Sequence, residues 1–160
     1  MTAKKEKNIR LIEVPSEVGA GTRGASLGIE AVKIAALDFR SKFFKTYRSI
    51  VIPNDNAALH GNPGSRYAKH IRSVLKMYER VGAAVRDTLR DARFPLIISG
   101  DHSSAGGTIA GIKMAYPECR LGVIWIDAHA DLHSPYTSPS GNMHGMPLAT
   151  ALNEDNIEEK

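Results

Sequence analysis

Two clusters of metal-binding residue types follow apolar runs in this 160-residue chain. The first is Asp127, His129 and Asp131, directly after the apolar run 121–126. In an extended chain, residues two apart point the same way, so these two carboxylates and one imidazole can face a single point. The second cluster, 100–103 (Gly-Asp-His-Ser), follows a shorter apolar run. Such residues after a strand also serve as turn formers and caps, but the two clusters together favour a metal site.

The predicted ligands of that site are His102, Asp127, His129 and Asp131. Nitrogen and oxygen donors suit manganese, iron, cobalt, nickel or zinc, and the oxygen-rich set without a thiolate favours manganese. Asp127 or Asp131 could bridge two ions, and two ions close together can hold a hydroxide that is nucleophilic near neutral pH. Asp101 has a different predicted role, which is to accept backbone hydrogen bonds and to orient His102 or its loop.

A polar stretch at 140–145 (SGNMHG) is predicted to form the rim of the site. Its His144 could pass a proton to a leaving amine, because imidazole titrates near neutral pH; the alternative is a histidine on a surface loop. His133 has three possible roles, as a rim residue, an extra ligand or a loop filler.

Alternating strands and helices must position these residues. Strands are expected at 9–14, 49–53, 94–99 and 121–126, and helices at 28–38, 65–93, from Ser103 or Ser104 to 117, and at 145–152. This order predicts an α/β domain over 1–160 with three layers and a mainly parallel sheet, and a loose basic tail at 1–7. Chemistry in such sheets lies at the carboxyl ends of the strands. The glycines at 19, 21 and 24 lack both dinucleotide and P-loop spacing and are read as a turn.

The composition narrows the class of protein. Apolar residues make up 42% and charged residues 24% of the chain, as in ordinary soluble domains. The net charge is +4, but the cations are dispersed and no recognition motif accompanies them, so no nucleic-acid partner is expected. Cys119 is the only cysteine, which suits a reducing compartment. With no run long enough for a signal peptide or a membrane span, we expect a cytoplasmic protein without a membrane partner.

Four stretches resemble successive blocks of the arginase (ureohydrolase) family. They are VPSEVGAGTRGASLGIEAVK (14–33), SGDHSSAGGT (99–108), VIWIDAHADLHSP (123–135) and TSPSGNMHGMPLA (137–149). The last block is more similar to arginases than to agmatinases. The resemblance implies an arginase-like sandwich, a centre with two Mn²⁺ ions and hydrolysis of a small guanidino substrate, most simply L-arginine to L-ornithine and urea. It also implies a homo-oligomer, a trimer or a hexamer.

The resemblance also implies roles for single residues. His102 would bind one ion, His129 the second, and Asp127 and Asp131 would bind or bridge them. His144 would carry the proton, and Ser140 and Asn142 would contact the amino-acid end of the substrate.

Three departures from the family pattern accompany the resemblance. Ser99 replaces a usual glycine. His133 stands where arginases usually have an asparagine that holds the substrate carboxylate, so agmatinase or guanidino-acid hydrolase activity is an alternative. The family's later Asp-x-Asp block, which supplies two more metal ligands, does not occur before Lys160. The chain therefore resembles an amino-terminal half. By itself it is expected to bind manganese weakly and to turn over arginine poorly, and a non-catalytic metal-binding fragment is a third possibility.

Overall fold

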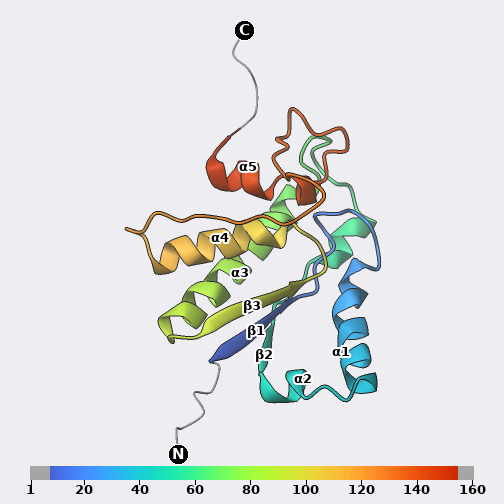
Figure 1. The fold of residues 1–160 in the computed structure, drawn as a ribbon. Coiled ribbons are helices and arrows are strands. Elements are labelled where there is room, and N and C mark those ends of the chain that lie inside the picture. Colours follow the sequence, from blue (N-terminus) through green and yellow to red (C-terminus); the bar gives the residue numbers. More distant parts are fainter. Residues whose placement is uncertain (1–7, 155–160) are drawn as a thin grey trace, which may run out of the picture.

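A parallel sheet lies at the centre of the computed structural model, which describes residues 8–154 (Figure 1). Within this range the sheet has three strands in the order β2-β1-β3, with β1 at Ile9–Val14, β2 at Ser49–Val51 and β3 at Phe94–Ser99. Ile12 of β1 pairs with Ile50 on one side and with Ile97 on the other. Because the strands are parallel, the carboxyl ends of β1 and β3 lie together at one edge of the sheet.

Helices cover both faces of the sheet, which confirms the predicted α/β class. Ile12 and Val14 of β1 belong to a buried core with residues of α3 (Ile71–Arg90). Side chains alternate along a strand, so Glu13 points to the opposite face. There its carboxylate meets Lys33 of α1 (Gly28–Asp38) at 2.7 Å.

Helix α4 (Ser104–Ala115) packs along α3 through glycines (Figure 1). A Cβ atom at Gly111 would lie 2.6 Å from the Gly82 carbonyl oxygen and 2.7 Å from Val85 Cβ. The two helix backbones can approach this closely only because these positions carry no side chain. The remaining helices are short: α2 (Phe43–Thr46), α5 (Pro147–Leu152) and the 3-10 helices η1 (Ala25–Leu27), η2 (Asn56–His60) and η3 (Met143–Gly145).

Several predicted boundaries were wrong by a few residues. Helix α3 begins at Ile71 rather than at 65, because residues 67 and 68 donate backbone hydrogen bonds to the Ser65 hydroxyl and His70 has φ 54°. Strand β2 ends at Val51, and α5 begins at Pro147 because a 3-10 turn precedes it. Ser103 occupies the N-cap position of α4 without capping it, since its hydroxyl donates to Asp101 instead.

The predicted strand at 121–126 was wrong. This segment forms no strand in the described residues, and Ile124 and Ile126 are 90% and 94% exposed. Figure 1 shows it as the orange trace that runs beside α4. A cavity of about 670 Å³ lies between the segment and β3, with Ile97 and Ser99 in its lining. An apolar run forms a stable strand only where a neighbouring strand takes up its backbone hydrogen bonds. Within 8–154 no strand pairs with this segment.

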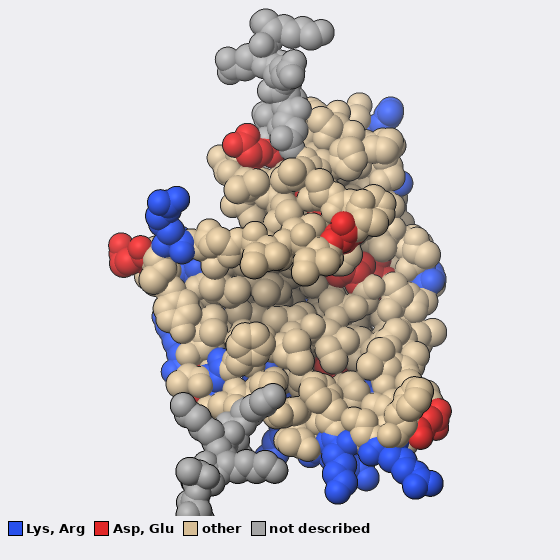
Figure 2. All heavy atoms as spheres, in the orientation of Figure 1, with Lys and Arg blue, Asp and Glu red and all other residues tan. Residues whose placement is uncertain are grey.

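Most of the central surface drawn in Figure 2 is uncharged. The exception is a hollow in which acidic side chains are visible. On this face, lysine and arginine lie mainly toward the periphery. In the stretch from 8 to 154, no helix has the length and apolar character that a membrane span needs. Cys119 is exposed and unpaired in the described part of the chain.

Candidate metal centre and proton-transfer site

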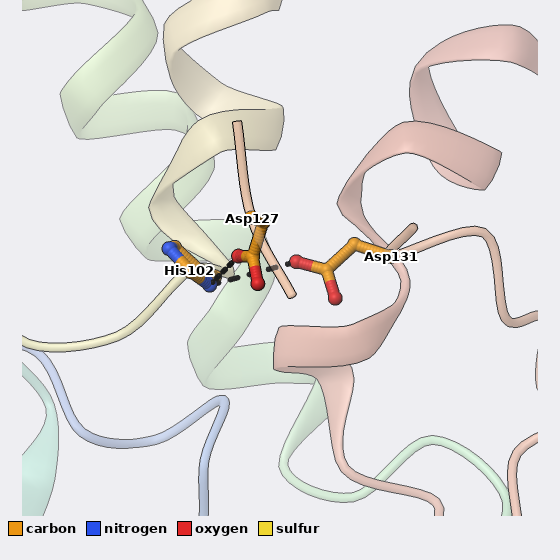
Figure 3. Close-up of side chains that lie close together, drawn as sticks. All are labelled: His102, Asp127 and Asp131. Carbon is orange, nitrogen blue, oxygen red and sulfur yellow. Dashed lines mark ion pairs between the residues drawn. The ribbon is translucent and has the colours of Figure 1, made fainter. Parts of the chain in front are cut away.

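Three of the four predicted metal ligands converge (Figure 3). His102 follows β3 in the loop that leads to α4, and its Nδ1 lies 2.9 Å from Asp127 Oδ2 and 3.6 Å from Asp131 Oδ2. One ligand atom from each residue can be chosen so that all three lie within 4.8 Å of one another. These separations are those of atoms that could share one cation.

A turn, rather than an extended strand, brings the two aspartates together. The backbone N–H of His129 donates to Asp127 Oδ1 at 2.9 Å, and Asp131 has φ 51°, in the left-handed region. This turn rotates His129 outward. Its side chain is 82% exposed, and its Nδ1 lies 3.4 Å from Asp127 Oδ1, the same oxygen that accepts from its backbone N–H. His129 therefore lies outside the group of three.

The two carboxylates are arranged as acceptors without donors. Asp127 Oδ2 and Asp131 Oδ2 are buried and accept no hydrogen bond from any described residue, although His102 Nδ1 is close. The pKa of Asp127 is lowered, first because the His129 backbone donates to it. The pKa of Asp131 is raised, first because burial removes its carboxylate from water. Buried carboxylate oxygens that accept no hydrogen bond, beside an imidazole nitrogen, are suitable ligands for a divalent cation.

A cavity of about 770 Å³ opens beside this group, within the range of small-molecule sites. Its lining contains all the residues predicted to bind metal or substrate or to move the proton, namely His102, Asp127, His129, Asp131, His133, Ser140, Asn142 and His144. The structure thus brings the 140–145 rim to the residues predicted to bind metal. His133 lies in the same lining, with its Nδ1 3.2 Å from the Thr137 hydroxyl.

The rim is held by the turn that follows β1. The backbone N–H and the Nδ1 of His144 both lie 3.1 Å from the Gly19 carbonyl oxygen. The side-chain amide of Asn142 donates to the Ala20 carbonyl oxygen at 2.9 Å. These contacts join positions more than 120 residues apart in the sequence.

The importance of this turn was missed in the sequence, where the glycines at 19, 21 and 24 were read only as a turn. The signal was present in the topology. Parallel neighbours such as β1 and β3 place the loops after their carboxyl ends side by side. A contact between residues 19 and 101 could therefore have been inferred. The predicted role of Asp101 as an acceptor of backbone hydrogen bonds is confirmed, since its carboxylate accepts from the N–H groups of Gly19, Ala20 and Ser103.

Comparison with known proteins shows one consistent similarity. The model of the arginase family matches residues 7–160. The arginase of Bacillus caldovelox is 39% identical over 150 residues, which cover 91% of this chain and 49% of that protein, and the arginase of Bacillus subtilis is 39% identical over 149 residues. The chain thus spans about half the length of the curated relatives it matches.

Solved structures agree with the sequence comparison. The native structure of the Bacillus caldovelox arginase superposes with a TM-score of 0.77 at 35% identity, covering 95% of this chain and 54% of that one. The Entamoeba histolytica arginase, solved in complex with L-ornithine, superposes with a TM-score of 0.70 at 32% identity, covering 89% and 49%.

Proposed function

The chain belongs to the arginase family, and we propose that its site serves the manganese-dependent hydrolysis of a guanidino compound, with L-arginine as the leading substrate and urea as a product. The observation that carries this proposal is the convergence of His102, Asp127 and Asp131 beside a cavity of substrate size. Hydrolysis of a guanidinium needs a water made nucleophilic and a proton for the leaving amine. The cavity is lined by residues that could meet both requirements.

Manganese would be held by His102, Asp127 and Asp131, with His129 as a fourth ligand once its ring turns inward. Bound there, the cation would supply Lewis acidity and lower the pKa of a coordinated water. The protein contributes the charge. The lowered pKa of Asp127 favours its ionised form, and Asp131 is buried.

His144 is proposed to carry the proton to the leaving amine. Its ring lines the same cavity as the three converging ligands. Because a carbonyl oxygen can only accept, the contact between Nδ1 and Gly19 places the proton of a neutral ring on Nδ1. The second nitrogen, Nε2, is then the one that can take and give a proton.

Ser140 and Asn142 are proposed to contact the end of the substrate that is remote from the reacting carbon. Both line the cavity, and the Asn142 amide is fixed in place by its hydrogen bond to Ala20. A residue held in this way loses little further freedom when a substrate binds.

Metal binding by the chain is the first test. Titration calorimetry with MnCl₂ should show binding that weakens by more than about tenfold in His102→Ala, since even residues that only orient a metal ligand are typically worth 10–100-fold. His60→Ala, at an exposed position of η2, is the matched control and should bind like the wild type. Equal affinity in the wild type and in His102→Ala would refute the assignment.

The choice of substrate is the second test. Urea release should be measured on arginine, agmatine and guanidino acids. Arginine is expected to be preferred. His133 lines the cavity and favours the second candidate, a ureohydrolase for another guanidino substrate, because an imidazole there presents different groups to a carboxylate than an asparagine would. Preference for agmatine or a guanidino acid would establish that alternative.

A further inference from the structure

One peptide unit joins Asp101 to His144. The N–H of Ala20 donates to Asp101 Oδ2 at 3.3 Å, and the N–H of Gly19 donates to the same oxygen at 3.1 Å. The carbonyl of Gly19, which belongs to the same peptide group as the Ala20 N–H, accepts from the Nδ1 and from the backbone N–H of His144. The order of groups is therefore carboxylate, peptide, imidazole.

Hydrogen bonds in such a chain strengthen one another. A carboxylate that accepts from the Ala20 N–H draws electron density through the peptide toward the Gly19 oxygen, which becomes a better acceptor. A better acceptor favours the form of His144 that carries its proton on Nδ1. Both Asp101 and the Gly19 carbonyl are thus matched to one tautomer of one ring.

The fit around the turn is close. A Cβ atom at Gly19 would lie 2.8 Å from Asp101 Oδ1 and would clash with the Ser103 hydroxyl. The other side of the Asp101 carboxylate is held by the backbone N–H of Ser103 at 2.8 Å and by the Ser103 hydroxyl. The carboxylate is therefore fixed from both sides and cannot turn away from the peptide without losing several hydrogen bonds.

We propose that Asp101 is a positioning residue that sets the tautomer of His144 through the Gly19–Ala20 peptide. A carboxylate bonded directly to a histidine fixes the tautomer of that ring. Asp101 would have the same effect on His144 through one intervening peptide group. The role of His144 in proton transfer rests on the proposed function. The tautomer does not, because it can be measured without metal or substrate.

The test is the tautomer of His144, read from the ¹⁵N chemical shifts of the imidazole at alkaline pH, where the ring is neutral. In the wild-type chain His144 should be protonated on Nδ1. Asp101→Ala should lose this single state and show a mixture with the Nε2-protonated form. Asp87→Ala, which removes an exposed carboxylate from α3, is the matched control and should leave the tautomer unchanged.

A second variant covers the case in which Asp101→Ala fails to fold. Asp101→Asn keeps the shape of the side chain and removes the charge that acts on the Gly19–Ala20 peptide. It should give the same mixture of tautomers. An Nε2-protonated His144 in the wild type, or an unchanged tautomer in either folded variant, would overturn the proposal, and neither result bears on whether the protein binds manganese or releases urea.

Discussion

Replacing Ile126 with alanine tests whether segment 121–126 is uncovered in solution. A fully buried isoleucine side chain contributes roughly 1.5–3 kcal/mol by burial alone. Ile126 is 94% exposed, so truncation removes about a twentieth of that value, on the order of 0.1–0.2 kcal/mol. Ile12→Ala is the matched comparison. Ile12 of β1 is fully buried in the core that β1 shares with α3, so its truncation should cost about 2–5 kcal/mol.

Two optical signals separate the segment from the rest of the molecule in a urea titration. Far-ultraviolet circular dichroism reports the helices, and fluorescence reports Trp125, the only tryptophan, which lies inside the segment. Ile126→Ala should leave the dichroism midpoint where it is in the wild type, whereas Ile12→Ala should lower it strongly. If Ile126→Ala cost as much as Ile12→Ala, the segment would be buried in solution and its exposure in this structure would be wrong.

Two further predictions concern the layers that carry the site. Lys33→Met should destabilise the fold by about 1–3 kcal/mol, because it leaves the buried Glu13 carboxylate without its donor. The pKa of Lys33 is raised, first by its hydrogen bond to Glu13, so this stability is present below pH 10.5 and is lost as pH rises through the higher folded-state pKa. The urea midpoint of the wild type, followed upward from pH 10, should therefore fall more steeply than that of Lys33→Met, and parallel curves would contradict this. Gly111→Ala should cost about 1–3 kcal/mol because its Cβ forces α3 and α4 apart, whereas Gly122→Ala, which meets nothing within 4 Å, should leave the melting temperature unchanged; equal effects would refute the close contact.

The sequence predicted the elements whose patterns depend on their own residues. The helical period of 71–90 and the apolar run of 94–99 need only a nearby sheet or helix to be satisfied, and both formed. The run 121–126 has an equally strong apolar pattern and formed no strand. A strand requires a partner for its backbone, and no property of the run itself shows whether that partner is present.

The candidate site was predicted in composition but not in geometry. Spacing of two residues suggested that Asp127, His129 and Asp131 would share one face of an extended chain. The structure brings the outer two together through a turn and rotates His129 outward, because the Asp127 carboxylate binds the His129 backbone. Gly19 and Ala20 carry no polar side chain and act through their backbone, so only their place beside the carboxyl end of β3 reveals what they bind.

The candidate metal centre draws its residues from two segments, one that follows a paired strand and one that follows an unpaired run. His102 follows β3 and is flanked by the Asp101 carboxylate, which is tied to backbone on both sides. Asp127 and Asp131 follow the unpaired run 121–126. A cation bound to both segments would stabilise the folded chain by mass action, by about 2.7 kcal/mol at a free concentration of one hundred times Kd.

This linkage predicts where manganese should act. The ring of Trp125 lies 5.7 Å from that of His102, so its fluorescence reports the junction of the two segments. Manganese should raise the melting temperature and change the Trp125 emission of the wild type, and it should do neither in Asp131→Asn, which keeps the shape of the side chain but removes its charge. Asp91→Asn, just after α3, is the control that should respond like the wild type. A shift of the same size in Asp131→Asn would mean that manganese binds elsewhere, and the convergence of His102, Asp127 and Asp131 would then not be a metal centre.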